Sequence, residues 1–480
     1  MTTNTLVAKI WSFCDTLRDD GLGYGDYLEQ LTYLLFLKMA DENKSKYKLP
    51  VGCDWQSLKQ ANQLIIETYE ELLKTLSVSG GMLDKIFAGA QNKIHDSAKL
   101  KKLIKLIDEE NWTSKDVDIK GEIYESLLQK NAENSGAGQY FTPRAVIKAM
   151  VECIQPQPEE TISDPSCGTG GFFLGALEFL SKKKLTQKQE EFLKFNTFHG
   201  WEIESSTARL CLMNLFLHGI GDLKETPDIH VTDSLKDISS KKTKIVLANP
   251  PFGKSSSDIP TTDEKLAKKE GYFLRDDFWV TTSNKQLAFL QHIVSMLDVN
   301  GRAAVVLPDN VLFEGGAGET IRKKLLEETN LHTILRLPTG IFYAQGVKAN
   351  VLFFERPKKT GIPATKEVWY YDYRTNIHHS PKKNSLKYEH LKDFVEYYQP
   401  ESIEKRKITW SKEDEEGRWR KFTYNEITAR DKTNLDIFWL KDENLIDLEN
   451  LPEPDTLIDE IIENIESALG SFKTIRESLD

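Results

Sequence analysis

The sequence predicts an α/β protein, with a Rossmann-like, mostly parallel sheet of seven strands after an N-terminal helical domain and before a C-terminal helical tail. Three observations support this. Strand and helix patterns alternate between residues 139 and about 360, two strands end in motifs typical of ligand loops, and residues 1–130 show helical periodicity. We divide the chain into a helical domain (1–135), an α/β domain (136–365), an extension of mixed structure (366–450) and an assembly helix (451–480).

The helical periodicity is clearest near the N-terminus. Apolar residues recur at i, i+3, i+7 and i+11, which places them on one stripe of a helix: Leu28, Leu31, Leu35 and Met39. Residues 67–76 and 98–107 follow a similar pattern. The polar, glycine-containing stretch 131–138 then predicts a boundary.

A glycine cluster follows the first predicted strand, residues 162–164. After Asp164 the chain runs Pro165-Ser166-Cys167-Gly168-Thr169-Gly170-Gly171, and a helix is expected over 172–180. Glycine lets the backbone approach a ligand, and the helix N-terminus offers free N–H groups. The spacing is not G-x-G-x-x-G, so a nicotinamide dinucleotide is not favoured. A purely structural turn would have the same composition.

The next predicted strand, residues 197–202, ends in Glu202. A carboxylate at the tip of a second strand is well placed to accept both ribose hydroxyls of a nucleoside. A lone acid is more often a solvated surface residue. Its place in the series strand, glycine loop, helix, strand favours ligand binding.

Asn249-Pro250-Pro251-Phe252 ends an apolar run, 244–248, that predicts a buried strand. The Asn249 amide oxygen and the Pro250 carbonyl can accept both N–H groups of an exocyclic amine and so raise the electron density on its nitrogen. Two prolines stiffen the backbone, and Phe252 offers a face for a flipped base. A strand ending in a tight turn is the plain alternative. Together with the glycine loop, the tetrapeptide favours an amino-group methyltransferase.

These motifs together resemble the modification (methylation) subunit of type I restriction-modification systems, an N6-adenine DNA methyltransferase family of the gamma motif order. The resemblance covers most of the chain and includes residues 23–42, which are similar to that family's helical domain. It implies S-adenosyl-L-methionine as the cofactor and catalysis by Asn249, Pro250, Pro251 and Phe252. It implies cofactor binding by Gln139, Tyr140, Phe141, Thr142, Pro143, Arg144, Asp164, Ser166, Gly168, Thr169, Gly170, Gly171, Glu202 and Asp233.

The resemblance also implies partners. Double-stranded DNA would supply a flipped adenine that stacks on Phe252 and receives the methyl group directly, with no metal ion. A separate DNA specificity subunit would join two modification subunits, and a restriction subunit would complete the complex. Enzymes that methylate RNA bases or protein glutamine, and a non-catalytic scaffold that senses the cofactor, stay open as alternatives.

The net charge of −11 agrees with a separate DNA-reading subunit, because a protein that binds DNA alone is expected to be basic. Basic runs occur at 182–184, 382–383, 405–407 and 418–422, and each is either a DNA contact or a solvated face. Five scattered cysteines without C-x-x-C indicate a cytoplasmic protein, and no apolar run is long enough for a membrane span.

Three further segments carry expectations. Residues 253–284 predict a long loop, either over the DNA or on the free surface. The glycines of 314–318 suggest a mobile loop near the active face. Near the C-terminus an a/d pattern spans about three heptads and predicts a helix that docks on the specificity subunit or on its own body: Ile458, Ile461, Ile465, Ala468, Phe472, Ile475 and Leu479.

Overall fold

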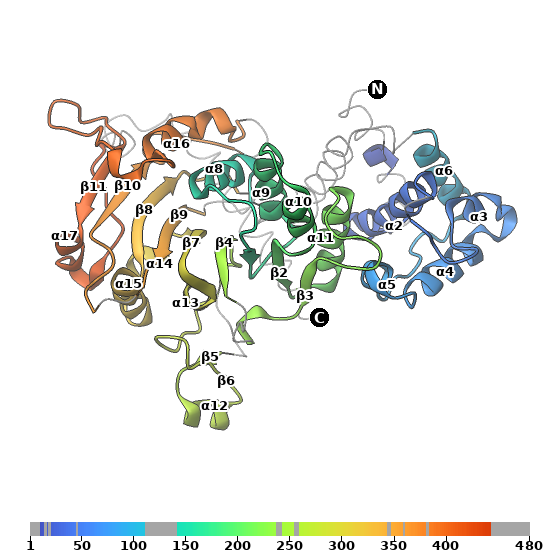
Figure 1. Cartoon of the computed structure of the whole chain (residues 1–480), viewed down its shortest axis with the longest axis horizontal. Helices are drawn as coiled ribbons and strands as arrows, with labels where there is room; N and C mark the ends of the chain where they lie inside the picture. Colours follow the sequence, from blue (N-terminus) through green and yellow to red (C-terminus); the bar gives the residue numbers. More distant parts are fainter. Residues whose placement is uncertain are drawn as a thin grey trace, which may run out of the picture.

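The structure is a computed structural model that describes ten stretches of the chain. They are residues 10–13, 17, 21–44, 47–110, 142–236, 242–253, 259–342, 347–358, 361–380 and 384–442. Figure 1 shows a helical part, in blue, beside a larger part built on one sheet. No helix in these stretches is long and apolar enough to cross a membrane.

The N-terminal part is helical, and the three predicted helices are confirmed there. The helices are α2 (Tyr24–Glu42), α3 (Trp55–Gln60), η1 (Asn62–Leu64), α4 (Ile65–Leu76), α5 (Gly81–Phe87) and α6 (Ser97–Asp108). Helix α2 was expected to bury one stripe, but most of its residues from Tyr27 to Ala40 are buried. The reason is its central position, with α3 and α6 on one side and α11 of the sheet part on the other.

One nine-stranded sheet organises the rest of the described chain, in the order β11-β10-β8-β9-β7-β4-β1-β2-β3. All pairs are parallel except those of β9 with β7 and β8, and that of β11 with β10. The strands are β1 (Ile162–Asp164), β2 (Phe198–Glu202), β3 (Asp228–Val231), β4 (Thr243–Ala248), β7 (Leu297–Pro308), β8 (Asn330–Leu337), β9 (Ala349–Arg356), β10 (Glu367–Asp372) and β11 (Trp419–Thr423).

The first seven of these strands, β1 to β4 and β7 to β9, match the predicted mostly parallel sheet of seven. The two additional strands come from the C-terminal extension, where β10 pairs in parallel with β8. The extension therefore widens the same sheet, because β8 would otherwise leave an open edge.

Helices cover both faces of the sheet. Figure 1 shows α8 and α9 on one side and α13 and α15 on the other. The strands alternate between two cores: Ile245 and Leu247 of β4 lie in one, and Val246 and Ala248 lie in the other. The helices on both faces are α8 (Arg144–Ile154), α9 (Gly171–Ser181), α10 (Gln187–Phe195), α11 (Ser205–Leu217), α13 (Lys285–Met296), α14 (Asn310–Phe313), α15 (Ala317–Glu328), α16 (Lys392–Tyr398) and α17 (Tyr424–Thr428). Short 3-10 turns are η3 (Ser234–Lys236), η4 (Tyr388–Leu391), η5 (Ile403–Lys405) and η6 (Asp431–Thr433).

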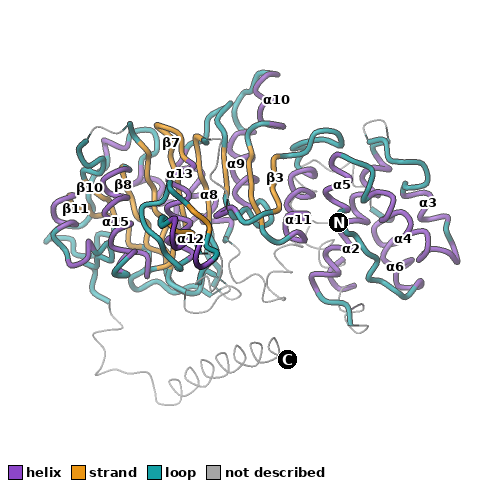
Figure 2. Tube along the Cα trace, turned by 90° about the horizontal axis from the view of Figure 1, so that it is seen from below, coloured by secondary structure: helices purple, strands orange, loops and turns teal. Residues whose placement is uncertain are grey.

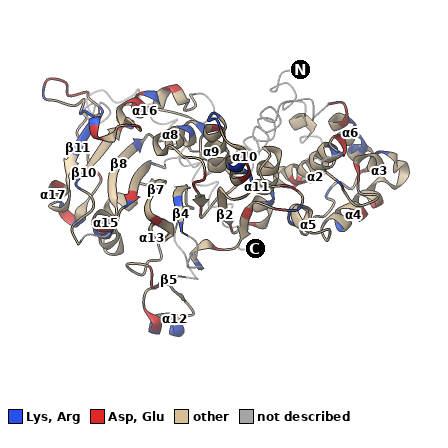
Figure 3. Cartoon of the chain, viewed as in Figure 1, with Lys and Arg blue, Asp and Glu red and all other residues tan. Residues whose placement is uncertain are grey.

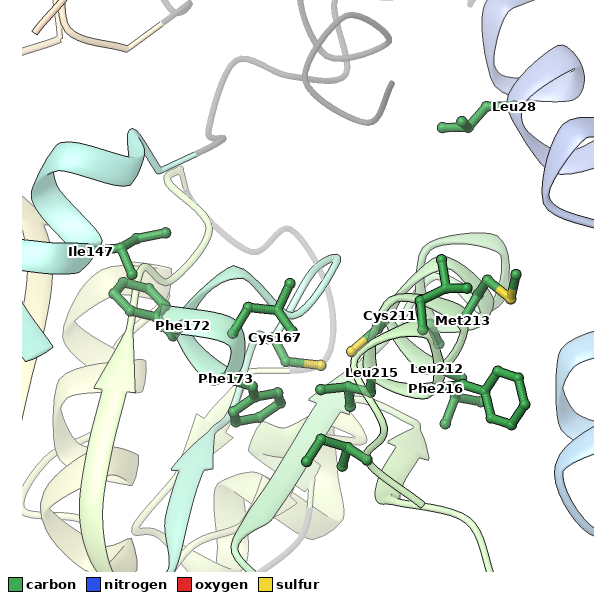
Figure 4. Packing of buried hydrophobic residues seen from close by; sticks show 14 of the residues in the cluster. Leu28, Ile147, Cys167, Phe172, Phe173, Cys211, Leu212, Met213, Leu215 and Phe216 are labelled. Carbon is green, nitrogen blue, oxygen red and sulfur yellow. The ribbon is translucent and has the colours of Figure 1, made fainter. Parts of the chain in front are cut away.

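Helix α11 joins the helical part to the sheet. The rings of Phe36 and Phe216 lie 5.3 Å apart, and Arg209 pairs with Glu29. The Met82 amide donates to the Leu223 carbonyl at 3.0 Å. Figure 4 shows the apolar side chains of α11 between the glycine-loop region and α2. One continuous core therefore links the N-terminal helices to the cofactor side of the sheet.

The segment predicted as a long loop has structure of its own in its described residues. It contains β5 (Pro260–Thr261), α12 (Glu264–Glu270) and β6 (Phe273–Leu274). It projects away from the sheet in Figure 1, and in Figure 2, seen from below, α12 lies in front of the sheet part. Buried Arg275 anchors it by donating to the Leu235 carbonyl at 2.7 Å and pairing with Asp277 at 2.7 Å. These charge-assisted hydrogen bonds of Arg275 attach the projecting segment to the rest of the protein.

Two basic runs have structural roles. In the run at 405–407, Arg406 is buried, donates to the Tyr398 carbonyl and lies 4.0 Å over the Tyr398 ring. In the run at 418–422, Arg418 donates to two backbone carbonyls, and Arg420 stacks on Trp410 at 3.8 Å. Strand β11 lies at the edge of the sheet, and these cations cover aromatic surface there.

Candidate active site

The candidate residues after four strands meet at one edge of the sheet. Asp164 of β1 lies beside Gly200 of β2, two residues before Glu202, and Glu202 lies beside Val231, two residues before Asp233. Parallel pairing of β1 with β4 brings Asn249 to the same edge. The order β2-β1-β4 makes β1 and β4 the point where the winding of the sheet reverses, which is where α/β sheets bind ligands.

The glycine loop after β1 is a tight cradle. Gly168 and Gly170 have φ of +54° and +84°, a region that favours glycine. A Cβ on Gly170 would lie 3.0 Å from the Cys211 sulfur, so the helix behind the loop also excludes a larger residue. Figure 4 shows Cys167 and Cys211 facing one another at this point.

The loop is tied to the second strand. The Gly168 amide donates to Glu202 Oε2 at 3.1 Å, and the Cys167 amide donates to the Trp201 carbonyl at 2.9 Å. The Glu204 amide donates to the other carboxylate oxygen of Glu202 at 2.9 Å. These bonds fix the Glu202 carboxylate next to the glycine cradle.

Asp164 and Glu202 form a pair of acids that have no cation partner among the described residues. Asp164 is 2% exposed, and burial raises its pKa to about 8, with a further contribution from the negative charge of Glu202. Burial also raises the pKa of Glu202. Neither carboxylate forms an ion pair with a residue in the described part of the chain. The pair suits a ligand that brings positive charge and hydroxyl groups, which S-adenosyl-L-methionine does.

The end of β3 completes this side of the site. Asp233 Oδ1 accepts from the Leu235 amide at 3.0 Å, and the Ser234 hydroxyl donates to the Pro165 carbonyl at 2.8 Å. Ile203 and Val231 are 69% and 55% exposed, so apolar surface flanks the acids. The sequence analysis did not select either residue. Ile203 could have been selected from the sequence, because it is an apolar residue directly after Glu202, the acid at the end of its strand.

The tetrapeptide is joined to the cofactor side by hydrogen bonds. Asn249 Nδ2 donates to the Thr142 hydroxyl at 2.9 Å, and the Ser166 hydroxyl donates to the Asn249 carbonyl at 3.4 Å. Pro250 is buried, while Pro251 and Phe252 are half-buried. Thr142, Ser166 and Asn249 come from three separate segments, and the fold brings them together.

The segment before α8 is only partly described. Pro143 caps α8, and Arg144 is its first residue. The predicted cofactor residues Gln139, Tyr140 and Phe141 lie outside the described residues. The described part of the chain contains no cluster of three or more His, Cys, Asp or Glu that could hold a metal ion.

Comparison with known families decides what kind of protein carries this site. A model described as N-6 DNA Methylase matches residues 115–438, and one described as the HsdM N-terminal domain matches residues 6–107. The chain belongs to the N-6 DNA methylase family. This methylase is therefore an adenine-specific DNA methyltransferase related to type I restriction enzymes.

Individual relatives agree over the whole length. The methylase is 39% identical to the StySJI methylase subunit of Salmonella typhimurium and 38% identical to the EcoKI methylase subunit of Escherichia coli, with 100% of this chain and 96% of each relative covered. These relatives support the interpretation as a DNA methyltransferase. They do not support an enzyme that methylates RNA bases or protein glutamine, or a non-catalytic scaffold.

Solved structures show the same fold. The crystal structure of the EcoKI M protein matches with a TM-score of 0.56 and 34% identity, over 99% of this chain and 96% of that one. A chain from a structure of the assembly and conformational transition of a type I restriction-modification system matches with a TM-score of 0.73 and 27% identity, over 100% and 99%. The fold of this methylase is thus that of S-adenosylmethionine-dependent methyltransferases with an added helical domain.

Proposed function

We propose that this methylase transfers a methyl group to the N6 nitrogen of an adenine flipped out of double-stranded DNA, at the edge formed by β1, β2 and β4. The observation that supports this most is the hydrogen bond from Asn249 to Thr142. It holds the Asn249 side chain at the end of β4, next to the segment before α8, where an amide can accept a hydrogen bond from a substrate amine.

The residues of the tetrapeptide act by orientation. Asn249 Oδ1 and the Pro250 carbonyl accept the two N6 hydrogens, and the adenine ring stacks on Phe252. S-Adenosyl-L-methionine, when bound, supplies an electrophilic methyl group. Held by these two acceptors, the N6 nitrogen would take up that methyl group in exchange for one of its protons, which would pass to water. Asn249 is no base, so its contribution is electrostatic and geometric.

The residues proposed to bind the cofactor lie on the side of Asn249 that faces the glycine loop. Glu202 accepts the ribose hydroxyls, Asp164 faces the positively charged methionine part, and Asp233 lies near the adenine ring. The loop residues Ser166, Gly168, Thr169, Gly170 and Gly171 allow close backbone approach. Residues 139–144 form the segment that closes over the methionine part, and Ile203 and Val231 provide apolar contact for the adenine.

A separate specificity subunit supplies the DNA sequence reading, with two methylase chains per specificity subunit and a restriction subunit in the full complex. Figure 3 shows Lys and Arg interspersed with Asp and Glu through both parts of the chain, which agrees with the net charge of −11. Of the four proposed divisions, the last, residues 451–480, is the docking helix, and it lies outside the described residues.

Asn249→Ala tests the assignment. Methyl transfer to DNA is measured with tritiated S-adenosyl-L-methionine and the chain co-purified with its specificity subunit, and cofactor affinity is measured by calorimetry. We expect at least a hundredfold loss of transfer, as for removal of one transition-state hydrogen-bond partner, with unchanged cofactor affinity. Asn425→Ala on exposed α17 is the matched control.

Three outcomes are informative. Loss of cofactor binding in Asn249→Ala contradicts the assignment. Transfer by the chain without its partner shows that it reads DNA by itself, which contradicts the charge argument. Absence of any label on adenine N6, with cofactor bound to the intact complex, overturns the proposed function as a whole.

A further inference from the structure

Asn214 is a polar residue in an otherwise apolar part of α11. Its neighbours in the helix between Cys211 and Leu217 are buried and apolar, and Asn214 itself is 1% exposed. A polar side chain that is removed from water needs hydrogen-bond partners in the protein, because burial without them destabilises the fold. The partner that Asn214 does have lies in the glycine loop.

The Asn214 side chain holds this loop by its backbone. Asn214 Nδ2 donates to the Thr169 carbonyl at 3.0 Å, across 45 residues of the sequence. A carbonyl oxygen only accepts hydrogen bonds, so the amide must turn its nitrogen and not its oxygen toward Thr169. Thr169 lies between Gly168 and Gly170, whose φ values of +54° and +84° define the turn of the loop. The bond therefore fixes the residue between the two left-handed positions.

The other end of the amide has no such contact. Asn214 Oδ1 is buried and has no hydrogen-bond partner in the part of the chain that the structure describes. An unpaired buried acceptor destabilises the protein, and this loss offsets the net gain from the single bond to Thr169. A leucine of similar size would suit an apolar helix at least as well. The stability of α11 therefore does not explain the asparagine, whereas the shape of the loop does.

Helix α11 is a firm support for this contact. On one side, helix and loop are in close contact, because a Cβ on Gly170 would lie 3.0 Å from the Cys211 sulfur. On the other side, the Phe216 ring packs 5.3 Å from the ring of Phe36 in the N-terminal helices. Asn214 is thus carried by a helix that is packed from both directions, so its amide can hold the loop in one position.

We infer that Asn214 is a positioning residue for the cofactor. By fixing the Thr169 carbonyl, it keeps the glycine loop in the shape that S-adenosyl-L-methionine requires before the cofactor arrives. A loop that is ordered in advance binds its ligand more tightly, since less conformational freedom is lost on binding. The inference rests on the proposed function, because that proposal assigns the glycine loop to this cofactor. Asn214 acts through Thr169 and takes no part in the transfer of the methyl group.

The test replaces the amide by apolar groups. Asn214→Leu removes the donor at similar size, and Asn214→Ala removes it without added bulk if the leucine variant does not fold. The cofactor affinity of the full chain is measured by calorimetry, and its stability by urea unfolding. Values of kcat and KM are measured by tritiated methyl transfer in the complex with the specificity subunit. Amide hydrogen exchange of residues 166–171 reports on the loop without ligand.

Met213→Ala is the matched control. Met213 is buried in the same helix, and Figure 4 shows it on the side of α11 away from Cys167. Truncating this side chain should lower the urea midpoint, because it leaves a cavity in the core. It should leave the cofactor affinity unchanged, because Met213 does not hold the loop.

Asn214→Leu is expected to raise the dissociation constant and the KM for S-adenosyl-L-methionine about tenfold, with kcat at saturating cofactor within about twofold of the wild-type value. Exchange of the loop amides should become faster in the ligand-free chain, while the urea midpoint changes little. This combination separates positioning of the loop from a role in folding, which would lower the midpoint and leave the affinity intact.

Three results would overturn the inference. An unchanged cofactor affinity in Asn214→Leu would leave the asparagine a role in the fold alone. A lower kcat with an unchanged KM would place its effect on the transfer step. An equal loss of affinity in Met213→Ala would show that any disturbance of α11 acts in the same way. Failure of the proposed function is distinct, because the wild-type complex would then label no adenine N6, whatever calorimetry reports for the variants.

Discussion

Cofactor binding to this methylase should release a proton from Asp164. The pKa of this buried carboxyl is about 8, so about 97% of the chains carry a neutral acid at pH 6.5. A positively charged ligand next to it favours the carboxylate and lowers its pKa. Binding at pH 6.5 should therefore release about one proton per chain, and affinity should rise about tenfold between pH 6 and pH 7.

The stability of the ligand-free chain, unlike its affinity for the cofactor, should decrease as the pH rises. A carboxyl whose folded pKa is raised binds its proton in the folded state over a wider range than in the unfolded state. Its stabilising contribution is complete below the ordinary value of 3.8 and is lost as the pH rises to about 8. The slope is about 1.4 kcal/mol per pH unit, so the ligand-free chain loses about 2.7 kcal/mol between pH 5 and pH 7. Asp164→Asn should remove this loss.

The assay is titration calorimetry of S-adenosyl-L-methionine into the chain at pH 6.5, in two buffers of different ionisation enthalpy. This pH lies below the usual pKa of an α-amino group, so the ligand's ammonium stays charged. The difference between the two enthalpies counts the released protons. Equal enthalpies in both buffers would contradict this prediction. Equal proton release by Asp164→Asn would also contradict it and would assign the proton to Glu202.

Two other predictions concern packing and assembly. Gly200→Ala places a Cβ 2.8 Å from Ile229 and 2.9 Å from the Cys167 sulfur. It should lower the free energy of unfolding in urea by about 1–3 kcal/mol and weaken cofactor binding through the glycine loop. The control Gly25→Ala should have neither effect, because Gly25 lies in a helix with open space around its Cβ position. Unchanged midpoints for Gly200→Ala would show that the neighbours yield freely. Deleting residues 455–480 should abolish co-purification with the specificity subunit and keep cofactor binding; co-purification at the wild-type level would show that the heptads serve another purpose.

Local patterns were sufficient for most of the sheet and for the order of its motifs. The run before Asn249 is apolar at every position but one, and it forms β4 because both faces of a parallel strand are covered. Glu202 could be placed because strand tips of a parallel sheet share an edge. In contrast, β10 and β11 were missed, since β10 pairs with β8 and β11 pairs with β10, and β8 takes this place only because β9 inserts between β7 and β8.

The segment after Phe252 shows the same limit. Its Ser, Thr, Lys and Asp content predicts a loop, yet Arg275 is buried among Leu235, Asp277 and His292, which lie 40, 2 and 17 residues away in sequence. The composition of a segment does not reveal such a partner set. A buried arginine is stable only where distant carbonyls and carboxylates converge on it.

Local sequence was enough to predict the chemistry of this methylase, because the glycine loop, the strand-terminal acid and Asn-Pro-Pro-Phe are each short arrangements. Which of these groups lie close together depends on how the whole chain packs. The bond from Asn249 to Thr142 spans 107 residues, and the raised pKa of Asp164 depends on burial and on Glu202. The physical reason is that burial and long-range pairing are properties of the packed chain, and neither is encoded in the spacing of a motif.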